Sequence, residues 1–395
     1  MKNGVHDPTI IQVDNEYYLL STDTGLPSTK GIPLRYSTDL VNWEFKKTIF
    51  KGIPSIAKEW TNAKGLWAPE IIYVDKEYRI YYSASTFGSS TSMIGLATAS
   101  HPLSEWTDQG IVVKTNADIA SHNAIDANIC DDEVGNQWMV YGSFFSGIYI
   151  VRLDKETGKC LEKGDYGKQI ALRPLAVEGA IEGPYIVYNE ETNYYYLFVS
   201  FDSLSDSYHI RVARSKKIDG PYEDFTGKSM LDLQSNPNEI GFKLLGSYQW
   251  IGEDALYAPG HNSIFYDQLT QQQFVVHHIR RAPFTEDFYM QIRPLFWLSD
   301  GWPVIGWSDY DGEVKVIAID SAKNQSKQWQ IVIFNSDSKV IEAEKMTEKD
   351  GFLFDCLGVK QINLKENIII YENKAGEIGL TGRLVTGQTF IGKIL

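Results

Sequence analysis

Short hydrophobic segments recur along most of the chain, and polar turns separate them. Each unit consists of a short opening segment that contains Ile, followed by an aromatic run such as 138–143 or 194–200. Runs of this length that are rich in β-branched and aromatic residues and bounded by Gly, Pro, Asn and Asp are typical of β-strands. The pattern therefore predicts an all-β protein.

This two-segment unit occurs five times. The openings lie at 6–11, 67–72, 125–129, 180–186 and 259–264, and the aromatic runs follow at 17–21, 78–83, 138–143, 194–200 and 274–278. One anchor residue marks each opening: Pro8, Pro69, Ala127, Pro184 and Asn262. The anchors are about 60 to 80 residues apart, a spacing typical of propellers and other repeat folds. We predict a five-bladed β-propeller over residues 1–304, with each opening as the innermost strand of its blade.

The repeat stops before the C-terminal part of the chain. Residues 305–395 contain short strand-like pieces at 315–319, 329–334 and 367–371, separated by turn residues. We predict a separate small β domain there, either a barrel or a sandwich. No group of potential catalytic side chains stands out in it, so we expect a structural cap more than a sugar-binding module.

Inner strands of a propeller converge on its axis, so residues at matching positions should meet there. Asp7, Asp126 and His261 each directly precede an anchor, and Glu182 lies one position further upstream. Taken singly, Asp7 and Glu182 are also typical turn residues next to Pro and Gly-Pro. Asp126 lies between apolar residues, where an unpaired carboxylate would be costly. Together they predict an acidic pocket on the axis.

Composition narrows the classes of function. The chain has 395 residues and a net charge of −14, which argues against a nucleic-acid surface. No apolar run approaches the roughly 20 residues that span a bilayer, and the three scattered cysteines suggest no disulfide framework. No signal-peptide pattern is present, so secretion after removal of a leader and a cytoplasmic location both stay open. We expect a monomer.

At these repeats the sequence resembles glycoside hydrolase family 43, in particular its arabinan endo-1,5-α-L-arabinosidases. The motifs that carry the resemblance are HDPTII at 6–11, LWAPEI at 66–71, YYSASTFGSSTSMIGLAT at 81–98, NAIDAN at 123–128, YGSFFSGI at 141–148, AIEGPYI at 180–186, YYYLFVSFD at 194–202 and PGHNSIF at 259–265. They span about residues 5–303. The tail more weakly resembles the small C-terminal β domain of extended members.

The resemblance implies a five-bladed propeller that hydrolyses glycosidic bonds with inversion. It implies Asp7 as general base, Glu182 as general acid, and Asp126 as the residue that orients the acid and tunes its pKa. His261 matches a histidine that contacts a hydrated axial metal ion, usually calcium. Ala127 departs from the family, which often has Pro there; this changes backbone stiffness and not chemistry. Inversion needs the acid and base roughly 6.5–9.5 Å apart, to admit a water, and an acid with a raised pKa.

Loops at equivalent places on neighbouring blades should line one groove across the acids. The predicted substrate-binding residues are Trp67, Phe87, Gly88, Asn123, Ser143, Phe144 and Phe145. Packing between blades is the alternative explanation for the aromatic ones. We predict cleavage of internal α-1,5 links in arabinan and arabino-oligosaccharides. The alternatives are an exo-acting α-L-arabinofuranosidase or β-xylosidase with the same acids in a pocket closed at one end, and a non-catalytic arabinan-binding propeller.

Overall fold

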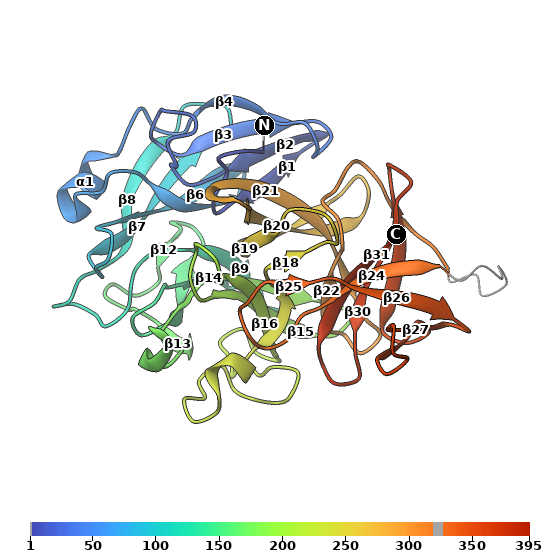
Figure 1. Ribbon diagram of the computed structural model, residues 1–395. Helices are drawn as coiled ribbons and strands as arrows, with labels where there is room; N and C mark the ends of the chain where they lie inside the picture. The colour runs from blue at the N-terminus through green and yellow to red at the C-terminus, as the bar shows by residue number, and fades with distance from the viewer. Residues whose placement is uncertain (1, 319–326) are drawn as a thin grey trace.

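The structure is a computed structural model that describes residues 2–318 and 327–395 (Figure 1). Five antiparallel sheets follow one another along the chain, and an eight-stranded sheet comes after them. The arrangement confirms the predicted all-β fold with five propeller blades. The predicted strand 315–319 corresponds to β23 (Val314–Val316), and Ile319 lies outside the described residues.

Each blade is built from consecutive strands. Blade 1 holds β1 (Thr9–Val13), β2 (Glu16–Leu20), β3 (Pro33–Ser37) and β4 (Glu44–Thr48). Helix α1 (Ser55–Thr61) leads to blade 2, which holds β5 (Trp67–Val74), β6 (Glu77–Ser85), β7 (Ser92–Ala99) and β8 (Thr107–Thr115). Blade 3 holds β9 (Asn128–Asp131), β10 (Gln137–Tyr141), β11 (Ile148–Asp154), β12 (Lys159–Cys160) and β13 (Lys168–Ala171).

The last two blades are the ones that lie nearest the C-terminal segment (Figure 1). After the short 3-10 helix η1 (Leu175–Val177), blade 4 holds β14 (Ile181–Asn189), β15 (Tyr194–Phe201), β16 (His209–Ser215) and β17 (Phe242–Leu245), with η2 (Pro237–Glu239) before β17. Blade 5 holds β18 (Tyr248–Gln249), β19 (Leu256–Asp267), β20 (Gln272–Arg281), β21 (Phe284–Trp297) and β22 (Pro303–Ile305). In every blade the predicted opening segment contributes to the inner strand and the aromatic run to the second strand.

The aromatic runs are apolar on both faces because each blade is packed between two others. In β15, Tyr195 and Leu197 pack with blade 3, whereas Tyr196 and Phe198 pack with blade 5. Successive side chains of a strand point to opposite faces, so one run of sequence contributes to both interfaces. Each pair of neighbouring blades shares one such cluster.

The ring closes through packing between blades 1 and 5. Leu19 of β2 shares a hydrophobic cluster with Phe274 and Val276 of β20. The Tyr17 hydroxyl donates a 2.9 Å hydrogen bond to Asp267. The segment before β1 adds a bridge between Asn3 and Tyr289 of β21. The closed ring therefore fixes where the five inner strands begin.

The C-terminal segment forms one sheet in the order β23, β29, β30, β31, β24, β26, β27, β28. Its remaining strands are β24 (Gln328–Ile333), β26 (Glu344–Lys349), β27 (Phe352–Phe354), β28 (Gln361–Asn363), β29 (Ile368–Asn373), β30 (Ile378–Arg383) and β31 (Thr389–Ile394). Residues from both ends of this order, such as Ile362 and Ile370, pack into one core. The sheet is therefore curled around that core.

This sheet packs firmly against the propeller. Val332, Tyr371 and Ile391 join the apolar cluster between blades 4 and 5, and β25 (Ile341–Glu342) pairs with β18 of blade 5. The division after residue 304 stays a prediction, and β22 of blade 5 ends at Ile305. Among the described helices, none is long and apolar enough to cross a membrane.

Candidate active site

The five inner strands begin with the same backbone turn. The residue before each anchor has a positive φ: Asp7 (52°), Ala68 (38°), Asp126 (62°), Gly183 (57°) and His261 (46°). Four of the five are not glycine, and such residues keep this conformation only where the surrounding fold enforces it. The repeat therefore exists in the backbone as well as in the sequence, and it brings Asp7, Asp126 and His261 to the axis as predicted.

Hydroxyl groups from the preceding blades hold three of these turns, at Ala68, Asp126 and His261. Ser83 Oγ accepts a 3.0 Å hydrogen bond from the Asp126 N–H, and Ser200 Oγ accepts one of 2.7 Å from the His261 N–H. Thr22 Oγ1 accepts a 2.8 Å bond from the Ala68 N–H and donates one of 2.5 Å to Asp7 Oδ2. These three turns are thus tied to a neighbouring blade, and the Thr22 hydroxyl holds the Asp7 side chain within blade 1.

Asp7 lies among three histidines. Its Oδ1 is 2.7 Å from His6 Nδ1, 3.1 Å from His261 Nδ1 and 3.7 Å from His278 Nδ1. Burial by itself would raise the pKa of Asp7, but the charges of His261 and His6 and the contact with His6 outweigh it and hold that pKa well below its usual range. Asp7 is therefore a carboxylate at any ordinary pH.

His6 and His278 were not among the predicted site residues. Their rings stack at 3.7 Å, and burial lowers the pKa of His278 well below its usual value, so its imidazole is neutral. In the strand ladder of blade 5, His278 lies opposite Gly260, the residue before His261. At the equivalent positions of blades 2 and 4, Ser83 lies opposite Trp67 and Ser200 lies opposite Glu182. Alignment of the aromatic runs would have shown that a histidine replaces the usual hydroxyl residue here.

Asp126 and Glu182 come from the neighbouring blades 3 and 4. Both are buried. Burial, followed by the nearby charges of Glu182 and Asp7, raises the pKa of Asp126 well above its usual value. The Gly183 N–H donates to Asp126 Oδ2 at 3.2 Å, and Ser143 Oγ donates to Glu182 Oε2 at 2.7 Å. A proton is therefore retained on this side of the site, while Asp7 has none.

Two of the predicted groove loops place aromatic side chains at the surface. Phe87 is 88% exposed, and its ring meets Trp67 edge-to-face at 6.4 Å. Phe145 is 43% exposed and follows Phe144, whose N–H donates to the carbonyl oxygen of Ile181 at 2.8 Å. The loop at 144–145 is thereby fixed beside Glu182.

The other predicted substrate-binding residues differ in surroundings. Ser143 contacts Glu182 directly, as described above. Gly88 is exposed in a turn with φ +76°. Asn123 is buried, and its side chain accepts a hydrogen bond from Ser92 of blade 2. A substrate-binding role stays a prediction for all seven residues.

A small cavity of about 20 Å³ lies on the axis. All five anchors line it, together with Asp7, Asp126 and His261, the residues that directly precede three of those anchors. A space of this size is enough for one water molecule. The Asn262 side chain is buried at this cavity, and neither its oxygen nor its nitrogen has a hydrogen-bond partner among the described residues.

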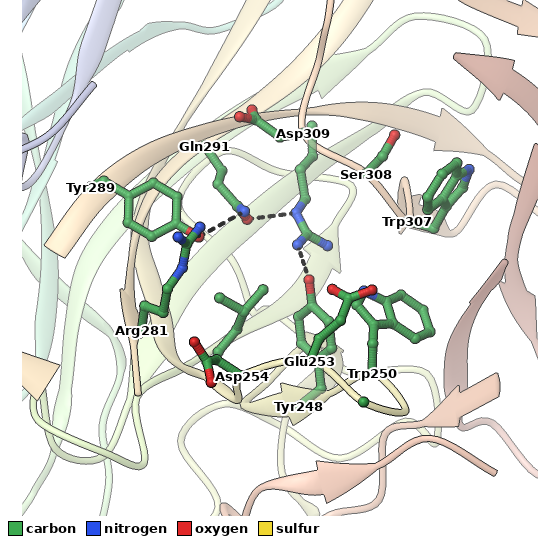
Figure 2. Close-up of a pocket in the computed structure, with 13 residues that line it drawn as sticks. Tyr248, Trp250, Glu253, Asp254, Arg281, Tyr289, Gln291, Trp307, Ser308 and Asp309 are labelled. Carbon is green, nitrogen blue, oxygen red and sulfur yellow. Dashed lines mark hydrogen bonds between the residues drawn. The ribbon is translucent and has the colours of Figure 1, made fainter. Parts of the chain in front are cut away.

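A larger cavity, of about 550 Å³, lies on blade 5 beside the chain that leads to the C-terminal sheet (Figure 2). A hydrogen-bonded row crosses it from Arg281 through Tyr289, Gln291 and Arg293 to Tyr248. Its carboxylates are exposed or paired with lysines, as Glu253 is with Lys393. The cavity contains no predicted site residue, so we place the chemistry on the axis.

Comparison with known families agrees with this site. Glycosyl hydrolases family 43 matches residues 1–303 of the chain. The chain belongs to this family. The matched part covers all five blades up to the first residue of β22.

Members of family 43 that are similar to this chain include bacterial arabinanases. An extracellular endo-α-(1→5)-L-arabinanase of Thermotoga petrophila is 36% identical over 348 residues, which cover 78% of this chain and 72% of that protein. An extracellular exo-α-(1→5)-L-arabinofuranosidase of Cellvibrio japonicus is 31% identical, over 78% of this chain and 88% of that protein. The crystal structure of the endo-1,5-α-L-arabinanase from Thermotoga petrophila superposes with a TM-score of 0.84 at 29% identity, over 100% of this chain and 99% of that one.

Proposed function

We propose that the protein is an endo-acting arabinanase that hydrolyses internal α-1,5-L-arabinofuranosidic links in arabinan with inversion. Membership of family 43 makes it a glycoside hydrolase. Relatives from Thermotoga petrophila and Bacillus subtilis that cover most of the propeller are named extracellular endo-arabinanases. Those names also support action outside the cell, on a polysaccharide. A monomer stays our expectation.

One observation carries the proposal: neighbouring carboxyl groups have pKa values displaced in opposite directions. The pKa of Asp7 is lowered by its histidines, and that of Asp126 is raised by burial and by the charges of Glu182 and Asp7. Hydrolysis by inversion needs both a base that is ionised and an acid that is protonated at the same pH. An ionised Asp7 suits activation of water, and a proton held beside Glu182 suits protonation of the leaving oxygen.

We assign the roles accordingly. Asp7 is the general base, and His6 and His261 keep it ionised and oriented. Glu182 is the general acid, held by the Ser143 hydroxyl. Asp126, bonded to the Gly183 N–H beside that acid, orients it and retains the proton.

The endo mode is supported by the exposed aromatic side chains. Phe87 on blade 2 and Phe145 on blade 3 present apolar surface beyond the buried acids. Aromatic faces of this kind pack against sugar rings, and an internal cut requires binding of several sugar units on both sides of the bond. The exo-acting alternative uses the same acids, and the similarity to the Cellvibrio japonicus exo enzyme keeps it as the second candidate.

We further propose a hydrated calcium ion on the axis beside His261, with the small axial cavity taking one water of its shell. Calcium prefers oxygen ligands, and the unpartnered Asn262 amide and the carboxylate of Asp7 offer oxygen beside this histidine. By contrast, His6, Asp7 and His278 form a group richer in nitrogen, which suits a transition metal better. A bound calcium ion would supply a fixed positive charge near the carboxylates. Loss of thermal stability with a chelator, restored by calcium and not by magnesium, would support this site.

Product analysis on debranched linear arabinan tests the function. We expect the wild type to release a spread of oligosaccharides early, and Glu182→Ala to release none while it keeps its circular dichroism spectrum. Proton NMR of the first products should show inverted anomeric configuration. Release of arabinose alone would move the assignment to the exo mode. Binding of arabinan by a wild type that does not hydrolyse it would favour the non-catalytic propeller.

A further inference from the structure

A second ring of polar residues lies one position beyond the anchors. These residues, one from each blade, are Thr9, Glu70, Asn128, Tyr185 and Ser263. All except Tyr185 are at most 4% exposed. Apolar residues would be expected at buried positions of inner strands. Polar residues at such positions need partners: Thr9, Asn128 and Tyr185 find theirs in Glu70, and Ser263 bonds to the backbone of blade 1.

Glu70 of β5 is the centre of this ring. Its Oε2 accepts a 2.8 Å hydrogen bond from Thr9 Oγ1 of blade 1, and its Oε1 accepts one of 2.8 Å from Asn128 Nδ2 of blade 3. The Tyr185 hydroxyl of blade 4 also interacts with Glu70 and lies 3.3 Å from the carbonyl oxygen of Ile264 in blade 5. One carboxyl group therefore contacts three other blades directly.

The three blades that Glu70 contacts are the ones that supply the acids. Thr9 is two residues after Asp7, Asn128 is two after Asp126, and Tyr185 is three after Glu182. Blade 2 itself has Ala68 at the position where blades 1 and 3 have an aspartate. Blade 2 therefore supplies no carboxyl group beside Asp7, Asp126 and Glu182. It supplies the Glu70 carboxyl group, which joins the three strands that carry those acids.

Two further bonds complete the ring. Asn128 Oδ1 accepts from the Ile186 N–H at 2.9 Å, so Asn128 links Glu70 to the strand that carries Glu182. Ser263 Oγ donates to the carbonyl oxygen of Pro8 at 2.7 Å, next to Asp7. A change at Glu70 is therefore transmitted through one or two hydrogen bonds to the strands that carry the acids.

We propose that Glu70 is a positioning residue that sets the spacing of Asp7, Asp126 and Glu182 by joining their inner strands. The proposal rests on the hydrolytic function proposed above. Burial raises the pKa of Glu70 to about 7 against the bonds from Thr9, Asn128 and Tyr185. A carboxyl group that can be neutral near pH 7 is suited to joining these strands, because in its neutral form it does not repel the negative charges of the acids.

The test compares Glu70→Ala, Glu70→Gln and Glu70→Asp in kcat and KM on linear arabinan. A displacement of about 1 Å in catalytic groups costs about 100-fold in rate, so we expect Glu70→Ala to lose about that factor in kcat with KM nearly unchanged. Glu70→Gln keeps the length and most of the bonds, and should stay within about tenfold of wild type. Glu70→Asp is one methylene short, and should lose most of the rate although it keeps the charge.

Asp267 provides a matched control. It is also a buried carboxyl group that accepts a bond across a blade interface, from Tyr17, but it is the last residue of β19, six residues beyond His261. Asp267→Ala should lower thermal stability and leave kcat of the folded protein within about threefold of wild type. If Glu70→Ala loses no more kcat than Asp267→Ala, Glu70 is only a stabilising residue and the proposal is wrong.

Two outcomes need separate treatment. If Glu70→Ala does not fold, Glu70→Asp decides, since a wild-type kcat in that variant would overturn the proposal. If the wild type does not hydrolyse arabinan, the proposed function is wrong, and the role of Glu70 is then tested by the spacing of the three acids in crystal structures. Crystal structures of the wild type and Glu70→Asp should then show the three acids displaced relative to one another, and unchanged spacing would refute the proposal.

Discussion

Thr22 offers a direct test of how the turns hold the acids. Its hydroxyl donates to Asp7 Oδ2 at 2.5 Å and accepts from the Ala68 N–H at 2.8 Å, and the residue is buried. Thr22→Val has nearly the same shape and removes both bonds. A hydrogen bond to a charged group contributes about 1.5–3 kcal/mol, and a buried amide without a partner costs about 1–3 kcal/mol. We expect a loss of about 3–5 kcal/mol in the free energy of unfolding.

This loss translates into a measurable melting shift. Unfolding entropy is about 2.1 cal/mol/K per residue, or roughly 0.8 kcal/mol/K for a chain of this size. Differential scanning calorimetry should therefore show Tm lower by about 4–6 °C. The Thr22 bond favours the charged form of Asp7, so its removal raises the pKa of Asp7. His261 and His6 still hold that pKa well below its usual range, so the acid limb of the kcat/KM profile should stay where it is.

Thr22→Ser is the matched control because it keeps the hydroxyl and loses one methyl group, which is worth about 0.8 kcal/mol. Its Tm should fall by about 1 °C and its pH profile should match wild type. If Thr22→Val melts within 1 °C of Thr22→Ser, the hydroxyl does not hold the turn.

Three further changes test other parts of the structure. Because the pKa of Asp126 is raised in the folded state, the native protein binds more protons than the unfolded chain above pH 4, and wild-type stability falls as pH rises from there. Urea unfolding should therefore show Asp126→Asn gaining stability relative to wild type over that range. A stability difference that stays constant with pH would contradict the raised pKa. A Cβ at Gly260 would lie 2.2 Å from the Tyr208 ring, so Gly260→Ala should lose at least 2 kcal/mol by thermal melting, whereas Gly88→Ala, in open space at φ +76°, should lose about 1 kcal/mol. Removal of 305–395 exposes the cluster between blades 4 and 5, so the shortened protein should aggregate on size-exclusion chromatography, and a stable monomer would show that the C-terminal sheet is not a required cap.

The repeat in the sequence was sufficient to predict the propeller and the meeting of distant acids. Strand periodicity and anchor spacing locate the inner strands, and the ring geometry then brings Asp7, Asp126 and His261 together without further information. The same alignment contains two signals that single motifs hide: the histidine at 278, where other blades have a hydroxyl residue, and the carboxyl group of Glu70 one position after an anchor.

Other features depend on tertiary structure and could not be predicted from sequence. Ala68 and His261 adopt positive φ because bonds from neighbouring blades hold their N–H groups, and neither residue type favours that conformation. The pairing of β25 with β18 joins segments about 90 residues apart, at two residues only. The pKa displacements depend on which groups are desolvated together, and this is known only once the blades are packed.

The departure of blade 4 from the repeat explains how equivalent strands yield an asymmetric site. A Cβ at Gly183 would lie 3.1 Å from the His261 ring, so a side chain at the position that Asp7 and Asp126 occupy would be crowded in this blade. Its carboxyl group comes from Glu182, one residue earlier, where it pairs with Ser143 and not with a histidine. Asp7 is beside histidines because His6 precedes it in the chain and blade 5 contributes His261 and, in place of the usual hydroxyl residue, His278. Two local exceptions in a fivefold scaffold thus separate an ionised carboxylate from a pair that retains a proton, and inverting hydrolysis needs this difference.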